Sequence, residues 1–151
     1  MKSAIPVFFG LLTLSLLVFG FSVMHNLGYG HLIELRWFNA VFLTTGIAMG
    51  IQMVKRTFPK KFNYMEGLKV GLSISFLAIA AFTSFVYLVA LVDESFMLKI
   101  VKTQTGLRFL NPELLSLIHL LEGSILGLVL TIAIMQFQRG SYVRRVLDKI
   151  A

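Results

Sequence analysis

The sequence predicts an all-α integral membrane protein: a four-transmembrane-helix bundle, one membrane domain over residues 1–151, with a short interfacial helix between spans three and four. Hydrophobic residues make up 57% of the chain and charged residues only 14%, against the usual quarter in soluble proteins. A soluble fold of this length could not hide so much apolar surface. Four apolar runs approach the roughly 20 helical residues that cross a hydrocarbon core.

The four predicted spans cover residues 4–24, 37–54, 70–92 and 114–137. The first follows Lys2 and in this respect is similar to a secretory signal. Its apolar run is long for a signal, however, and no small-residue cleavage site followed by a polar segment appears. We therefore expect the first span to be a retained helix.

The connection between the third and fourth spans contains a predicted interfacial helix near Ser95 to Lys102. Its apolar residues share one helical face, and its lysines lie elsewhere, which is typical of a short helix in the membrane interface. These apolar residues are Phe96, Met97, Ile100 and Val101. Asn111 and Pro112 then suit the cap and the first turn of the fourth span.

The basic residues predict that both termini are cytoplasmic. Ten of the fourteen Lys and Arg residues lie on one side of the predicted topology: Lys2, Lys55, Arg56, Lys60, Lys61, Lys69, Arg139, Arg144, Arg145 and Lys149. By the positive-inside rule that side faces the cytoplasm. The net charge of +7 is thereby explained by topology, and no nucleic-acid partner is expected.

Two basic clusters on that side are expected to contact anionic lipid headgroups. The lipid bilayer is thus the first expected partner. The candidate headgroup residues are Lys55, Arg56, Lys60, Lys61, Arg144 and Arg145.

Three pairs of glycines, each four residues apart, predict close helix packing. Burial of apolar area drives little association in lipid, so close backbone approach matters more. The pairs are Gly46 and Gly50, Gly67 and Gly71, and Gly123 and Gly127. Together they favour a compact four-helix bundle, or a bundle that docks onto a partner.

The stretch GIQMVKRTFPKKFNYMEGLKVGLSISFLAIAAFTSFVYLVA resembles the bacterial membrane family catalogued as domain of unknown function 4199. Members similarly have a glycine-containing second span, a short basic turn, an aromatic residue and a GLKVGL-like start to the third span. Their last helix contains a glutamate followed by glycines, which Leu121, Glu122, Gly123 and Gly127 match. The resemblance covers most of the chain and implies four spans in a bacterial inner membrane. It implies no activity, because none is assigned to the family.

An ionisable pair in the fourth span is the main functional candidate. Glu122 lies about eight residues into the span, so roughly 12 Å from its outer edge, and His119 is one turn shallower on the same face. An acid within a span is often a proton or ion site, and this pair could exchange a proton. The alternative is a structural, neutral carboxyl that is hydrogen-bonded to a neighbouring helix. Asn39, Thr44 and Ser84 are candidate partners for it.

Other chemistry finds little support in the sequence. There is no cysteine, which excludes disulfides, thiolate metal sites and a cysteine nucleophile. His25, His31 and Glu34, with His119, offer imidazole and carboxylate groups but lack helical ligand spacing, so we expect no metal and no cofactor. No Ser-His-Asp order, phosphate loop or pair of carboxylates within one span appears. We therefore predict that the protein is not an enzyme.

These patterns predict a small non-enzymatic inner-membrane protein that acts as an accessory or scaffold subunit through helix–helix association. Its expected protein partners are further copies of itself in a homo-oligomer, or a larger membrane complex. The alternative is a small proton- or cation-coupled transporter or binding protein that uses Glu122 and His119, with Asn39 as a polar contact. The apolar stretch from Ile125 to Phe137 offers few polar positions, so an outward-opening pocket is expected rather than a full path.

Overall fold

The computed structural model describes residues 4–29, 36–60, 62–103 and 111–150, which form five α-helices and no strand. The helices are α1 (Ala4–Asn26), α2 (Arg36–Thr57), α3 (Tyr64–Val92), α4 (Glu94–Thr103) and α5 (Pro112–Ile150). Four segments are long and apolar enough to cross a membrane: Ala4–Asn26, Trp37–Thr57, Tyr64–Val92 and Pro112–Gln138. The prediction of an all-helical chain with four candidate spans is therefore confirmed.

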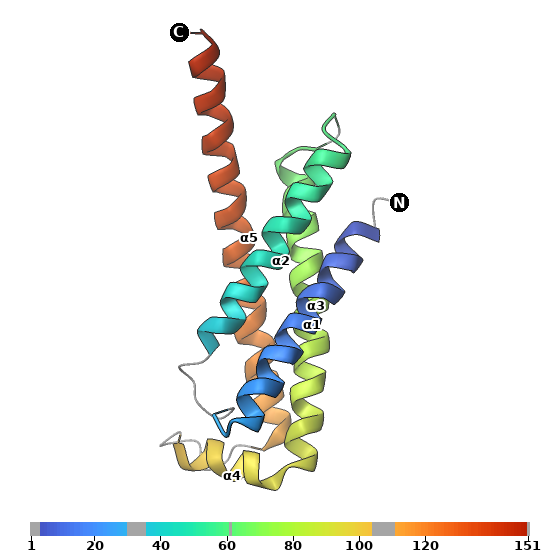
Figure 1. The fold of residues 1–151 in the computed structure, drawn as a ribbon, viewed down its shortest axis with the longest axis vertical. Helices are drawn as coiled ribbons and strands as arrows, with labels where there is room; N and C mark the ends of the chain where they lie inside the picture. The colour runs from blue at the N-terminus through green and yellow to red at the C-terminus, as the bar shows by residue number, and fades with distance from the viewer. Residues whose placement is uncertain (1–3, 30–35, 61, 104–110, 151) are drawn as a thin grey trace.

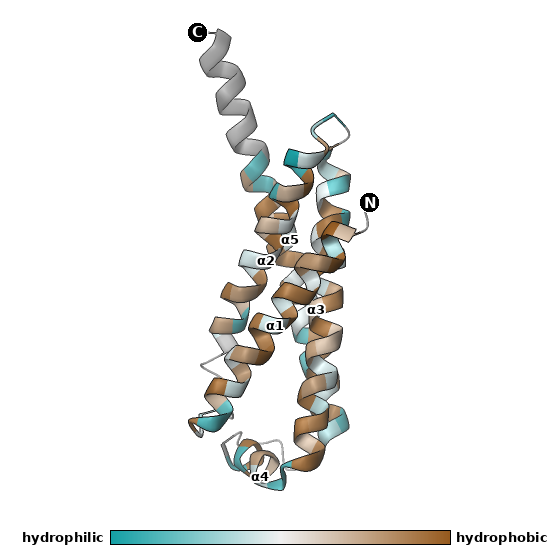
Figure 2. Cartoon of the chain, turned by 45° about the vertical axis from the view of Figure 1, so that its right-hand side comes forward, coloured by the Kyte–Doolittle hydropathy of each residue, from teal (hydrophilic) through white to brown (hydrophobic). Residues whose placement is uncertain are grey.

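The four long helices run alternately up and down (Figure 1). The start of α1, the turn between α2 and α3, and the end of α5 lie toward one end of the bundle, while α4 lies across the other end. Figure 2 shows apolar residues along all four long helices and more hydrophilic ones at the turn between α2 and α3. The arrangement is that of four antiparallel helices, with α5 extending beyond the bundle.

Helix α3 is the centre of the bundle. It packs against α1, α2, α4 and α5, and its residues Ile74, Ala78 and Val86 are almost completely buried. By contrast, only 11% of the residues in the apolar window of α5 are buried, against 44% of those in the apolar window of α3. The two helices are similarly apolar, so hydropathy alone does not separate the inner helix from the outer one.

Two asparagines begin helices. The Asn63 side chain accepts a hydrogen bond from the backbone N–H of Glu66 at 2.8 Å, and that of Asn111 accepts one from Leu114 at 2.7 Å. Each satisfies a backbone donor that the first helical turn leaves unpaired. The predicted cap at Asn111 is confirmed. The cap at Asn63 also explains why α3 begins at Tyr64, before the apolar run predicted to start at residue 70.

The apolar face of α4 packs against the bundle. Phe96 and Ile100 are buried, and Met97 and Val101 pack against the same core. This apolar face is the reason that we predicted an interfacial helix. In the structure it contacts the helices of the bundle. The helix is therefore where we expected it in the chain, while its position relative to a membrane stays a prediction.

Each of the six glycines assigned to packing lies where another helix of the same chain approaches. A Cβ on Gly127 would lie 2.7 Å from Ser75 Cβ, and one on Gly123 would lie 2.8 Å from Ile79 Cγ2. Side chains there would force α3 and α5 apart. The remaining four face Thr13 (Gly46), Ile74 (Gly50), Met135 (Gly67) and Thr131 (Gly71). Packing within the chain accounts for all three pairs, so association with a partner needs other support.

Candidate functional site

The three polar residues proposed from the sequence as a proton or cation site line one cavity. Asn39 comes from α2, and His119 and Glu122 come from α5; Thr83 of α3 joins them. The cavity has a volume of about 80 Å³. This is enough space for several water molecules or a small ion. Three helices thus bring an amide, an imidazole, a carboxyl and a hydroxyl together.

The rest of the cavity wall is apolar. Its other lining residues are Leu17, Leu43, Ile79, Phe82, Gly123 and Leu126. Leu17 brings α1 to the cavity, so all four long helices contribute to it. Polar groups surrounded by such a wall interact more strongly than they would in water, because the local dielectric constant is low.

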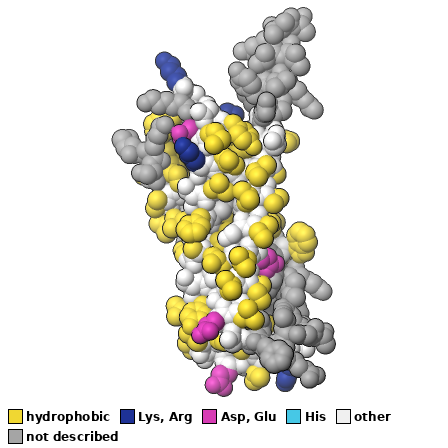
Figure 3. All heavy atoms as spheres, turned by 180° about the vertical axis from the view of Figure 1, so that it is seen from behind, with side chains coloured by type: hydrophobic (Ala, Val, Ile, Leu, Met, Phe, Trp, Pro, Cys, Tyr) yellow, Lys and Arg dark blue, Asp and Glu magenta, His cyan; other side chains and the backbone are white. Residues whose placement is uncertain are grey.

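The cavity opens toward the flank of the bundle. Glu122 is exposed, whereas His119 and Asn39 are half-buried. Glu122 nevertheless lies inside the apolar segment Pro112–Gln138. Figure 3 shows apolar side chains over much of one flank, with the basic side chains toward its ends. A carboxyl on an otherwise apolar flank is costly in lipid unless it faces a cavity, a ligand or another protein.

Thr83 is the residue of this site that the sequence did not single out. It is only 8% exposed, and its hydroxyl is the one buried side-chain oxygen or nitrogen of the described residues without a hydrogen-bond partner. Leaving such a group unpaired costs about 1–3 kcal/mol. This cost makes Thr83 an unusual position in an otherwise well-satisfied bundle.

The other hydroxyls of the spans behave differently. Thr13, Ser75 and Thr131 are also buried, and each donates to the backbone carbonyl four residues earlier in its own helix, at 2.7 to 2.9 Å. This is the usual way for Ser and Thr to satisfy their hydroxyls within a helix. The equivalent carbonyl for Thr83 is that of Ile79, and Thr83 does not use it. Thr83 itself lines the cavity, and its hydroxyl has no hydrogen-bond partner among the described residues.

Two of the suggested structural partners of Glu122 lie elsewhere. The Thr44 hydroxyl donates to Ala40 O at 2.6 Å, and that of Ser84 donates to Ala80 O at 2.9 Å. Neither residue lines the cavity, whereas Asn39 does. Of the three candidates, Asn39 is the one that lines the same cavity as Glu122.

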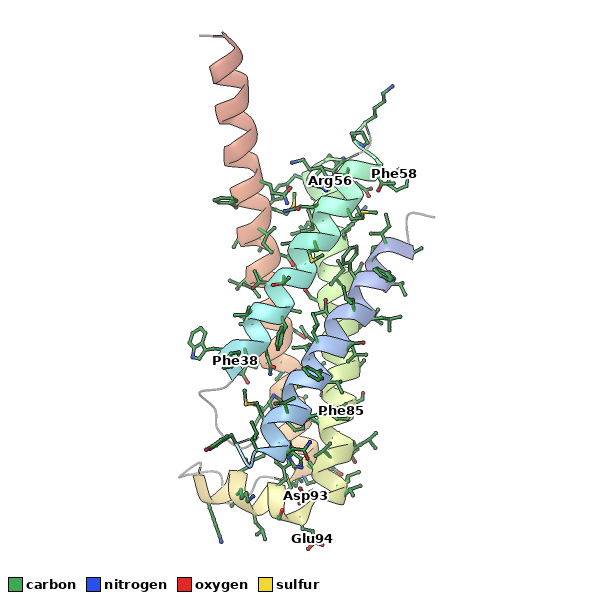
Figure 4. The ribbon with its side chains drawn as sticks, viewed as in Figure 1. Phe38, Arg56, Phe58, Phe85, Asp93 and Glu94 are labelled. Carbon is green, nitrogen blue, oxygen red and sulfur yellow. The ribbon has the colours of Figure 1, made fainter. Side chains whose placement is uncertain are left out.

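Three of the basic residues proposed for lipid headgroups are described, namely Lys55, Arg56 and Lys60, and they lie at the end of the bundle opposite α4. The Lys55 ammonium donates to Gln138 Oε1 at 3.4 Å and lies 5.9 Å from the centre of the Phe62 ring. Arg56 and Lys60 are exposed. Lys61 and the side chains of Arg144 and Arg145 lie outside the part of the chain that the structure describes. In Figure 4, Arg56 lies at one end of the bundle, and Asp93 and Glu94 lie at the opposite end.

His25 contributes to a contact between α1 and α4. Its Nε2 lies 3.2 Å from Asp93 Oδ2, and its ring stacks on Phe21 and meets Phe96 edge-on. Asp93 caps α4 by accepting from the Ser95 hydroxyl at 2.7 Å and the Phe96 N–H at 3.1 Å. The hydrogen bond from Ser95 is the main cause that holds the pKa of Asp93 below its usual value, with Phe96 and His25 acting in the same direction.

The structure gives no support to a metal centre built on His25. His31 and Glu34 lie outside the described residues. Within those residues, no three His, Cys, Asp or Glu side chains form a group that could hold a metal ion. His25 is instead occupied by its contact with Asp93.

No family model, curated protein or solved structure matches this chain. The resemblance to the family catalogued as domain of unknown function 4199 therefore stays a prediction.

Proposed function

We propose that the protein is a small non-enzymatic membrane protein that binds a proton or a small cation at the cavity of Asn39, Thr83, His119 and Glu122. The observation that carries this proposal is that Thr83, whose buried hydroxyl is unpaired, lines the same cavity as a carboxyl and an imidazole. Ionisable and polar residues within a span are expensive and usually mark a site of ion or proton binding. A bound ligand would offset the cost of the Thr83 hydroxyl.

The chemistry of the cavity suits such a ligand. Carboxylate, amide and hydroxyl oxygens are the donors that hard cations prefer, and imidazole and carboxyl groups one helical turn apart can exchange a proton. On the side away from α4, the apolar side chains of Leu43 and Leu126 line the cavity. Beyond them, Thr131 is fully buried, and its hydroxyl is bonded to Gly127 O. We therefore propose access from the flank and the α4 side rather than a path across the membrane.

For the topology we propose four passes through a bacterial inner membrane, with both chain ends in the cytoplasm and α4 on the outer side. The distribution of basic residues supports this orientation. The cavity would then open to the outer half of the bilayer, where protons and cations of the outer medium could reach it.

Thermal unfolding across a matrix of pH and salts tests the binding proposal. A ligand that binds only the folded protein stabilises it by about 2.7 kcal/mol at 100 times its Kd. Wild type should gain stability with Na⁺, K⁺ or a shift in pH, relative to choline. Glu122→Gln should lose that response, and Glu94→Gln, an exposed acid of α4, should retain it. A wild-type response identical to that of Glu122→Gln would contradict the proposal.

A role as an accessory or scaffold subunit is the second candidate. It is favoured by the small buried share of the α5 span and by the exposed Glu122 on it, because a partner helix there would remove the carboxyl from lipid. In a homo-oligomer the partner would be a second α5. Native mass spectrometry of the gently solubilised protein tests this role. A strict monomer with no copurifying protein would contradict it.

A further inference from the structure

We propose that a groove between α2 and α5 binds one anionic phospholipid at the end of the bundle opposite α4. The groove encloses about 960 Å³. This volume lies near the upper end of the range found for small-molecule sites, about 300–1,000 Å³. Its lining consists of Thr44, Ala48, Gln52, Lys55 and Arg56 from α2, and Leu130, Ala133, Ile134, Phe137 and Gln138 from α5. It is separate from the cavity of Glu122, and the inference does not depend on the proposed function.

The lining changes in character along the groove. Ala48, Leu130 and Ile134 line its inner part, whereas Lys55 and Arg56 belong to the last turn of α2. Figure 4 shows Arg56 near the end of the bundle. A ligand that fits must therefore carry an apolar chain and an anionic head at one end. A phospholipid with a net negative headgroup has this chemistry, and basic pockets between membrane helices bind such lipids.

The basic end of the groove is held in place without a carboxylate. The Lys55 ammonium contacts the neutral Gln138 amide oxygen and the face of the Phe62 ring. Within the described residues, neither Lys55 nor Arg56 forms an ion pair. Both cations can therefore meet a phosphate, and a guanidinium can bind it through two parallel hydrogen bonds.

A lipid fits the groove better than a second copy of the chain. Two copies in the same membrane share one orientation, so a twofold pair of grooves would bring two basic ends together. Their repulsion would oppose the pairing. The groove also lies on the α5 side of the bundle, where the span is least covered by protein. Lipid therefore has direct lateral access to it.

Native mass spectrometry of the full chain in detergent tests this inference. We expect one phosphatidylglycerol to remain bound where phosphatidylcholine does not, and inorganic phosphate not to compete at equal concentration. Each basic group near the surface should strengthen lipid binding about fivefold. Lys55→Gln with Arg56→Gln removes two such groups and should therefore weaken binding about 30-fold. The matched pair Lys60→Gln with Lys69→Gln removes the same charge outside the groove. It should leave binding within about twofold of wild type.

A second variant separates the apolar wall from the basic end. Ala133→Phe fills the groove from α5 and retains every charge, so it should also abolish retention of the lipid. Arg56→Gln alone, at an exposed position, covers the case in which the double variant does not fold, and it should give a smaller loss. Equal binding of phosphatidylcholine, equal loss in the Lys60 and Lys69 control, full retention in Ala133→Phe, or a lipid-free dimer would each overturn the inference.

Discussion

At the scale of the residue, Thr83 is the most informative side chain in the bundle. Buried hydroxyls elsewhere in the spans are satisfied by their own helices, whereas that of Thr83 is not. An unpaired buried hydroxyl lowers stability, and a ligand in the cavity that Thr83 lines with Asn39, His119 and Glu122 would offset that cost. Stability and function should therefore respond in opposite directions when this hydroxyl is removed.

Thr83→Val provides that test. In the absence of ligand the variant should be more stable than wild type by about 1 kcal/mol, because an unpaired hydroxyl is replaced by a methyl group of similar size. Stabilisation by cation or pH should be lost. Thr83→Ser, which keeps the hydroxyl, should retain the response. Unfolding in a denaturing detergent series measures both effects, and a Thr83→Val protein that is no more stable and still responds to ligand would refute this role.

A second residue-scale prediction concerns Asp93. Its folded-state pKa is lowered from the ordinary value of 3.8, so its contribution to stability is present above that value and is lost as the pH falls through the lower folded value. Below about pH 4, wild type should lose docking of α4 progressively. Asp93→Asn should dock α4 less firmly at neutral pH and show no further loss in that acidic range.

Hydrogen exchange of α4 against pH measures this docking. Glu94→Gln, on the neighbouring exposed acid, is the control and should follow wild type. Identical acid profiles for wild type and Asp93→Asn would show that the cap and the contact with His25 do not hold α4.

At the scale of the element, the crossing of α3 and α5 depends on small residues. Gly127→Val would place atoms against Ser75, which a Cβ alone would already approach to 2.7 Å. Overpacking of this kind costs about 1–3 kcal/mol. Ser124→Val adds a similar side chain to the exposed surface of the same helix and should cost less than about 0.5 kcal/mol. Chemical unfolding of the two variants side by side measures the difference, and equal stability would show that the helices do not cross here as closely as described.

The four helices were predictable from the sequence because length and apolarity decide whether a segment can span lipid. The shared face of His119 and Glu122 was predictable because helical spacing determines it. The start of α3 was not, since the Asn63 cap acts before the apolar run. The packing of α4 on the bundle was not predictable either. Its amphipathic pattern is the same whether the apolar face contacts lipid or protein.

Partners across helices were harder to predict than faces. The glycine pairs indicated close approach, but the approaching residues, such as Thr131 at Gly71, follow from the crossing geometry. Thr83 stands out because its hydroxyl does not donate to a backbone carbonyl of its own helix. Whether a hydroxyl makes that hydrogen bond depends on its rotamer and its neighbours. The sequence offered one signal for Thr83. It lies four residues after Ile79 and eight after Ser75, on a helix already marked by small residues.

At the scale of the whole molecule, both chain ends should lie in the cytoplasm. Ten of the fourteen basic residues lie at the ends of the chain and around the turn between α2 and α3, and positive charge is retained on the cytoplasmic side. A reporter that is active only in the cytoplasm, fused after Ala151, should be active, and one that requires export should be inactive. Activity of the exported reporter alone would reverse the proposed orientation and the side from which the cavity opens.

Infrared difference spectroscopy of the protein in lipid measures whether Glu122 changes its protonation or binds a cation within the proposed span. We predict a carboxylic acid band that loses intensity when the pH is raised or when Na⁺ or K⁺ replaces choline. The same band should be absent from Glu122→Gln and retained in Glu94→Gln. A Glu122 band that stays constant across pH and cations, or a responding band that persists in Glu122→Gln, would show that Glu122 is not the binding site.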